Sequence, residues 1–76
     1  MEIDSVLPNR ASPGQSVIVQ GDSLESAEKV LIDDQEVPFD ADGGTLVVEI
    51  PDASGPVELT VEGAEGEGDT ANLTID

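Results

Sequence analysis

The 76-residue chain contains no Cys, His, Trp or Tyr, and Lys and Arg occur only once each. Without Cys it forms no disulfide, and without Cys and His it lacks the usual ligands of a tetrahedral zinc site. The lack of His also removes the side chain that most often serves as a general base near neutral pH. These absences exclude thiol chemistry and argue against catalysis, so we expect no enzyme activity.

Positive charge is nearly absent, because two basic residues stand against 18 acidic ones and the net charge is −16. A surface of this kind is repelled by phosphate backbones and by anionic lipids, so we expect no nucleic-acid partner. No apolar run approaches the roughly 18–20 residues that cross a bilayer, and the N-terminus lacks the basic start of a signal peptide. We therefore expect no membrane insertion.

The content of Leu, Ile, Val and Phe indicates a folded chain. These residues make up 21 of the 76, a larger share than the roughly 20% below which highly charged chains stay disordered. They also fall in short, spaced clusters. We predict one soluble domain over residues 1–76, with modest stability because so short a chain buries little surface.

The apolar residues alternate in short segments that Gly-rich and Pro-rich turns separate, which favours strands over helices. We predict strands at Ile3–Leu7, Gln15–Gly21, Lys29–Ile32, Gln35–Phe39, Thr45–Ile50, Val57–Val61 and Thr70–Ile75. Alternation places twelve side chains inward: Val17, Val19, Val30, Ile32, Leu46, Val48, Ile50, Val57, Leu59, Val61, Leu73 and Ile75. The predicted fold is all-β, an immunoglobulin-like antiparallel β-sandwich of about seven strands.

Three turn signals organise the middle of the chain. The pair Asp33-Asp34 separates two predicted strands by two residues and predicts a tight hairpin. Pro38 marks the second arm of this hairpin as an edge strand, because proline donates no hydrogen bond to a ladder. The segment Asp42-Gly43-Gly44 is the strongest turn signal of all. We expect most of the eight glycines to occupy turns or close backbone contacts.

Residues 13–24, Pro-Gly-Gln-Ser-Val-Ile-Val-Gln-Gly-Asp-Ser-Leu, resemble the second-strand signature of the IPT/TIG family of immunoglobulin-like domains. Residues 3–8, 30–38, 46–51 and 55–61 are similar to its other strands, with Asp33-Asp34 in place of the usual Gly-Gly turn. Leu24 and Ile32 stand where Phe is common. The resemblance implies a compact module that occurs in tandem in surface and extracellular proteins, beside carbohydrate-active enzymes and in some transcription factors.

The excess of Asp and Glu, the near-absence of Lys and the small aliphatic residues are typical of proteins from salt-loving archaea. In molar salt the Debye length falls to about 3 Å, so repulsion among carboxylates is largely screened. We predict a non-enzymatic structural or protein-interaction module, of spacer or adhesion type, adapted to high salt and part of a larger surface or secreted protein. A chain without Cys also fits the cytoplasm.

We expect the domain to be a monomer in isolation, with neighbouring domains or another protein as partners and no cofactor. The alternation that turns twelve residues inward leaves Ile18, Leu31 and Val47 facing outward. Together these three predict a small interaction patch. The alternative is that they are single exposed apolar residues, which are common.

The alternative function is a calcium-dependent binding module that uses acidic loop 40–44 or 62–69. The first loop carries Asp40 and Asp42, and the second is rich in Glu. Calcium takes six to eight oxygen ligands, but neither loop has the EF-hand pattern, so we assign no metal ligands. A carbohydrate-binding accessory domain is a third interpretation, against which the lack of Trp and Tyr argues.

Overall fold

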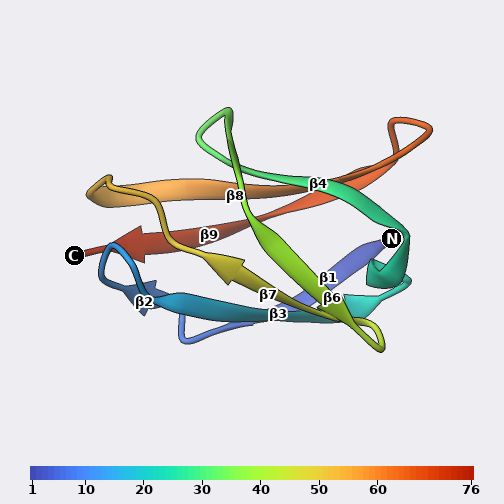
Figure 1. Ribbon diagram of the computed structural model, residues 1–76, viewed down its shortest axis with the longest axis horizontal. Helices are drawn as coiled ribbons and strands as arrows, with labels where there is room; N and C mark the ends of the chain where they lie inside the picture. Colours follow the sequence, from blue (N-terminus) through green and yellow to red (C-terminus); the bar gives the residue numbers. More distant parts are fainter.

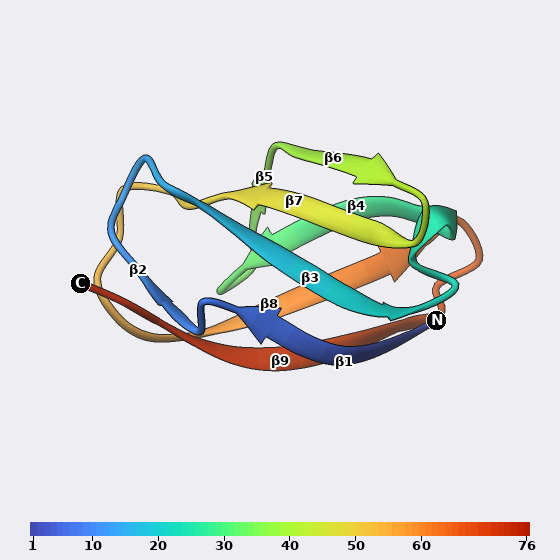
Figure 2. The ribbon, with the colours of Figure 1, turned by 90° about the horizontal axis from the view of Figure 1, so that it is seen from below.

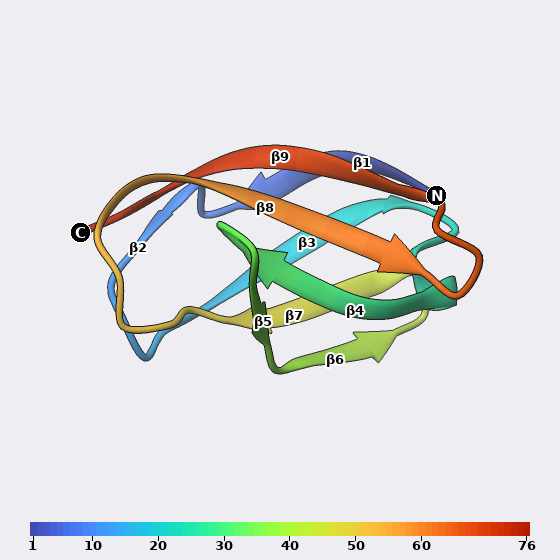
Figure 3. The ribbon, with the colours of Figure 1, turned by 90° about the horizontal axis from the view of Figure 1, so that it is seen from above.

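The computed structural model describes residues 1–76 as two β-sheets packed face to face (Figure 1). Sheet A is ordered β1 (Glu2–Leu7), β3 (Ser16–Asp22), β7 (Thr45–Glu49) and β6 (Phe39–Asp42). Sheet B is ordered β2 (Arg10–Ala11), β9 (Gly68–Ile75), β8 (Gly55–Gly63), β4 (Ala27–Ile32) and β5 (Gln35–Val37). Sheet A lies in front in Figure 2 and sheet B in Figure 3, with the two termini at opposite ends.

The core between the sheets is entirely aliphatic. All 16 buried residues are apolar, and no polar or charged residue is buried. The twelve side chains predicted to point inward are all among them, joined by Val6, Ala11, Leu24 and Val37. Leu24 lies in a short 3₁₀ helix, η1 (Leu24–Ser26), and is fully buried. The predicted immunoglobulin-like sandwich is thus confirmed.

The structure has nine strands where we predicted about seven, and Pro38 explains one of the additions. We predicted Gln35–Phe39 as a single edge strand, but β5 ends at Val37 in sheet B and β6 begins at Phe39 in sheet A. Proline has no N–H to continue a ladder, and the chain changes sheets at this residue. As a result, Asp40 and Asp42 lie on a strand rather than in the predicted loop.

The opposite side of the sandwich is built in the same way. After β1 the chain passes Pro8-Asn9 and continues as β2, which belongs to sheet B. β2 pairs with β9 in parallel, so sheet B is mixed rather than purely antiparallel. On both sides, a segment that changes sheets closes the sandwich, which shortens the edges exposed to other chains.

No helix in the structure is long and apolar enough to cross a membrane.

The close approach of β1 and β3 requires glycine at position 21. A Cβ atom placed on Gly21 would lie 1.9 Å from the carbonyl oxygen of Glu2, far inside van der Waals contact. Gly21 pairs with Ile3 next to an irregularity in the β1–β3 register. The sequence predicted a turn or a close contact for the glycines, and at Gly21 the structure shows the contact.

The hairpin between β4 and β5 places two non-glycine residues in the left-handed region. Asp33 has φ 49° and Asp34 has φ 70°, as a two-residue hairpin turn with positive φ at both positions requires. The Asp33 side chain also accepts a hydrogen bond of 2.9 Å from the backbone N–H of Glu58 on β8. Asp33 therefore ties the hairpin to the neighbouring strand, whereas no side-chain bond holds Asp34.

We predict that Gly21→Ala destabilises the domain by about 1–3 kcal/mol, because the new methyl group collides with the β1 backbone. The measurement is thermal unfolding followed by far-UV circular dichroism. Gln20→Ala, on an exposed position of the same strand, is the control and should change the melting temperature little. Equal melting temperatures for the two variants would contradict the close contact.

We also predict that Asp34→Gly stabilises the domain by up to about 1 kcal/mol, because glycine adopts a positive φ without steric cost. Asp34→Asn removes the same charge and keeps a side chain, so it separates the backbone effect from the charge effect. Chemical denaturation should rank the glycine variant above the asparagine variant. The reverse order would show that the turn is not strained at this position.

Candidate interaction surface

The exposed large apolar side chains form one row across the outer face of sheet A. Leu7 on β1 pairs with Ile18 on β3, and Ile18 pairs with Val47 on β7. Their exposed fractions are 54%, 41% and 36%, and no other large apolar residue is exposed to this degree. The next position in the row, on β6, is Asp40. We call Leu7, Ile18 and Val47 the apolar row.

The predicted patch of Ile18, Leu31 and Val47 is divided by the fold. Ile18 and Val47 are direct cross-strand neighbours, as the hypothesis requires. Leu31 lies on β4 in sheet B, where it is half-buried and pairs with Glu36 and Thr60. Because the outer faces of the two sheets point in opposite directions, Leu31 is not part of the same surface.

Leu7 belongs to this surface although our sequence analysis did not identify it. Strict alternation from Ile3 would turn Leu7 inward, but a register shift between Ile3 and Ser5 inserts one residue into β1. Val6 is therefore the buried residue and Leu7 faces out. A bulge of this kind reverses the facing of every later residue in the strand, and no glycine or proline within β1 signals it.

The neighbourhood of the apolar row is free of charge over much of its area. On one side Ser5, Gln20 and Thr45 form the adjacent outward row on β1, β3 and β7, which ends at Asp42 on β6, and on the other side Ser16 on β3 pairs with Glu49 on β7, so the charged residues lie on β6 and at the end of β7. Elsewhere the surface is strongly acidic, since none of the 18 acidic residues is buried. The centre of sheet A is thus a neutral strip on a highly negative molecule. A partner that binds there removes little water from charged groups, so the desolvation cost of binding is low.

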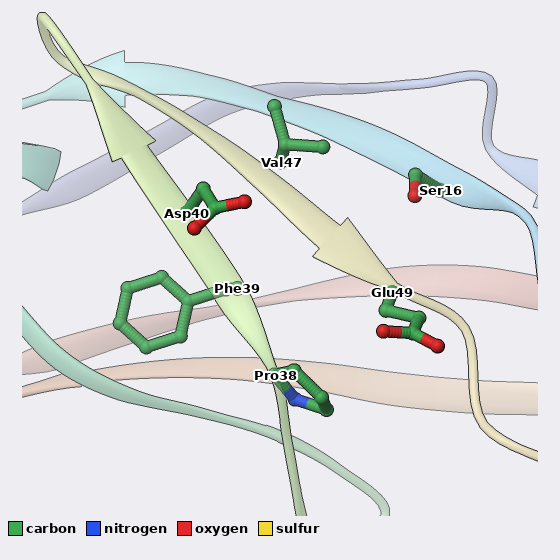
Figure 4. Close-up of a pocket in the computed structure, with 6 residues that line it drawn as sticks. All are labelled: Ser16, Pro38, Phe39, Asp40, Val47 and Glu49. Carbon is green, nitrogen blue, oxygen red and sulfur yellow. The ribbon is translucent and has the colours of Figure 1, made fainter.

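A shallow hollow adjoins one end of the apolar row. It has a volume of about 120 Å³ and is lined by six residues: Ser16, Pro38, Phe39, Asp40, Val47 and Glu49. Figure 4 shows the carboxylates of Asp40 and Glu49 on either side of the area that Val47 and Pro38 border. The hollow therefore combines apolar walls with two negative groups, the environment that suits an aliphatic stem ending in a cation.

Both basic side chains of the molecule are engaged elsewhere. Arg10 Nε lies 2.5 Å from Asp76 Oδ1, and Lys29 Nζ lies 3.5 Å from Glu62 Oε1. Such exposed ion pairs contribute at most about 1 kcal/mol each. Neither cation lies in the neutral strip or among the residues that line the hollow, so the carboxylates of the hollow have no Lys or Arg partner within the chain.

The two acidic segments considered as calcium loops do not bring their carboxylates together. No group of three or more acidic side chains in the structure is placed to hold a metal ion. Asp40 and Asp42 lie along β6, and Glu62 is paired with Lys29. Asp69 already accepts two backbone hydrogen bonds. Calcium requires several oxygen ligands that converge on one point, and neither segment offers them.

Asp69 instead connects the two sheets. Its carboxylate accepts hydrogen bonds of 2.8 Å from the N–H of Ile3 on β1 and 2.9 Å from the N–H of Thr70 on its own strand. These bonds, that from Ile3 first, lower the pKa of Asp69 below its ordinary value. The first bond joins the edge strand of sheet A to β9 of sheet B.

The fold matches domains of larger proteins of known structure. Gamma-CGTase from alkalophilic Bacillus clarkii matches 96% of this chain with a TM-score of 0.85 at 22% identity, and the match covers 12% of that protein. SGBP-B of the Bacteroides ovatus mixed-linkage glucan utilization locus, solved in complex with a mixed-linkage heptasaccharide, matches 90% with a TM-score of 0.73 at 22% identity. That match covers 21% of SGBP-B.

A sequence model of the IPT/TIG domain matches residues 1–75, which is nearly the whole chain. A comparison with curated protein sequences found no match. The family match agrees with the motif seen at residues 13–24 and with the observed sandwich.

The Asp69 bonds predict a pH-dependent difference between two charge-removing variants. Because the folded-state pKa is depressed, the carboxylate stabilises the fold above its unfolded pKa and loses this contribution as the pH falls through the folded pKa. Asp69→Asn should therefore melt below Asp42→Asn at pH 7, and the two should converge in strong acid. The two variants each remove one negative charge. Asp42 is exposed and makes no side-chain hydrogen bond, so the difference between the variants reports the bonds that Asp69 accepts. A constant difference at every pH would contradict this role.

Proposed function

Because the chain belongs to the IPT/TIG family of immunoglobulin-like domains, we propose that it serves as a non-enzymatic structural or protein-interaction module adapted to high salt. In this proposal it is one domain of a larger surface or secreted protein and is monomeric in isolation. The observation that carries the proposal is the division of the molecule into a wholly aliphatic interior and a carboxylate-rich exterior. That division provides stability and solubility, but it provides no catalytic group.

A non-catalytic role is supported by the residue types and by their placement. The chain has no His or Cys, so its serine hydroxyls have no imidazole to activate them. The one hollow on the surface is small, and its carboxylates belong to Asp40 on the edge strand β6 and to Glu49 on the neighbouring strand β7 of sheet A. Two carboxylates also serve glycoside hydrolysis, but that reaction requires them to face each other across a bound sugar in a cleft.

Adaptation to high salt is supported by the uneven charge balance. Sixteen uncompensated negative charges lie on a surface of 4279 Å², so carboxylates on the two sheets and their loops repel one another at low ionic strength. Molar salt screens this repulsion and also favours burial of the aliphatic core. A dense carboxylate surface meanwhile keeps the protein soluble where a neutral surface would associate.

Partners in this proposal are other domains or proteins rather than nucleic acid. Phosphate binding uses Lys and Arg, and the two that the chain possesses are already ion-paired with Asp76 and Glu62. The heptasaccharide in the SGBP-B structure is bound by that protein. A shared fold does not imply that this chain binds the same ligand. The matched domains form only 12% of Gamma-CGTase and 21% of SGBP-B, which supports a place for this domain within a larger protein.

We predict that the melting temperature rises steeply with salt, by more than 10 °C between about 0.1 and 3 M NaCl, because screening removes the repulsion among carboxylates. Far-UV circular dichroism is the suitable measurement for a chain without Trp or Tyr. A melting temperature that does not change with salt would refute the adaptation to high salt.

The matched control reduces the charge without touching the core. It replaces four exposed acidic residues by their amides: Asp22→Asn, Glu36→Gln, Asp42→Asn and Glu65→Gln. This variant should be more stable than the parent in dilute buffer and gain less from added salt. If both proteins gain equally, salt acts through apolar burial alone rather than through screening.

A further inference from the structure

We propose that the outer face of sheet A docks a protein surface that has an aliphatic centre and a Lys or Arg side chain beside it. The aliphatic centre covers the apolar row, and the cationic side chain enters the hollow between Asp40 and Glu49. This inference rests on the proposed function, because it names the contact surface and the chemistry of the partner for an interaction module.

The apolar row is the only place where large aliphatic side chains accumulate on the surface. Leu7, Ile18 and Val47 come from three different strands, and strand pairing alone brings them side by side. All three are exposed, whereas every other Leu, Ile and Val is buried or half-buried: Leu31 is half-buried on the outer face of sheet B, and the rest lie in the core or pack against it. An exposed apolar row within a neutral strip, on a surface otherwise rich in carboxylates, marks a contact site.

The hollow determines which partner fits this face. Val47 belongs both to the apolar row and to the lining of the hollow, so the two features are continuous. The methylene stem of a Lys or Arg can lie against Val47 and Pro38 while its charged end reaches the carboxylates of Asp40 and Glu49 (Figure 4). Ion pairs in direct contact and partly shielded from water are screened by salt much less than distant charges.

Charge complementarity also disfavours a second copy of this chain as the occupant. Two copies placed face to face would bring the same acidic margin, including Asp40 and Glu49, against itself. Each copy has only two basic side chains, and both are ion-paired on other surfaces. A partner that supplies its own cation satisfies the hollow, whereas a second copy leaves it unsatisfied.

The size of the surface indicates a weak contact that a covalent link or a larger interface would strengthen. Three exposed side chains and a hollow of about 120 Å³ fall well short of the roughly 800 Å² per partner of a stable free complex. Within one polypeptide, effective concentrations in the millimolar range make such contacts occupied. A neighbouring domain with this chemistry therefore suits the site well.

The test is an amide-resolved NMR titration of the labelled chain in about 3 M KCl, where diffuse charge effects are screened. The probe is the blocked peptide acetyl-Val-Thr-Val-Thr-Arg-amide, whose Val and Arg side chains share one face when it is extended. We expect saturable shifts at Leu7, Ile18, Val47 and the other residues of the hollow except Pro38, which has no amide proton. Replacing the Arg of the peptide by Glu, or both Val residues by Ser, should abolish them.

Matched variants separate this surface from the rest of the molecule. Ile18→Ser and the double variant Asp40→Asn with Glu49→Gln should each weaken binding about fivefold or more. Leu31→Ser and the double variant Glu36→Gln with Glu58→Gln make the same chemical changes on sheet B and should bind like the parent. Melting temperatures establish that every variant is folded.

Several results would overturn the inference. Equal binding of the Arg and Glu peptides would show that the hollow does not select a cation. Equal effects of the sheet A and sheet B variants would show that the binding is diffuse. Shifts along the apolar row that grow with protein concentration alone would identify a second copy as the occupant. A folded chain that binds no peptide overturns only this site, whereas a chain that unfolds in molar salt overturns the proposed function.

Discussion

Burial of aliphatic side chains between two sheets is the interaction on which the rest of the structure depends. The charges contribute little by comparison, because none of the 18 acidic residues is buried and only two have a Lys or Arg partner. The chain has no Cys to form a disulfide, no polar residue is buried in the core, and no three acidic side chains are grouped to hold a metal ion. A domain of this size buries a modest fraction of its surface, so a strict division between inward aliphatic and outward polar positions is the condition for folding at all.

The need to keep the aliphatic core buried also explains how the edges of the sandwich are closed and which residues remain on its surface. Pro38 on one side and Pro8-Asn9 on the other mark where the chain leaves one sheet for the other, so both sides are closed by continuous chain. Asp69 adds a bond across the sheets at the edge strand β1. With edges and core thus occupied, the outer face of sheet A is left as the surface with aliphatic side chains available for contact, and its neutral centre contrasts with the acidic margin.

The strands themselves were largely predictable, because alternation and turn residues are local properties. The prediction failed where one residue changed the phase or the sheet. Pro38 divided a predicted edge strand and placed Asp40 and Asp42 on β6, and the irregularity after Ile3 turned outward Leu7, for which the sequence analysis had assigned no face. Neither feature of the structure can be recognised from hydrophobicity or composition. Each depends on how a strand pairs with its neighbours, which a pattern along one strand does not contain.

The sequence alone determined the fold class, twelve of the 16 buried residues and the charge of the surface, because period-two alternation, turn chemistry and residue counts act through local geometry and simple electrostatics. Only the tertiary structure decided which outward residues share a surface. Alternation assigned Ile18, Leu31 and Val47 to outer faces, but strand order placed Leu31 on the opposite sheet and brought Leu7 beside Ile18. The reason is physical: strand pairing joins residues that are distant in sequence, and the aliphatic core that aligns the strands forms only when all of them are packed together.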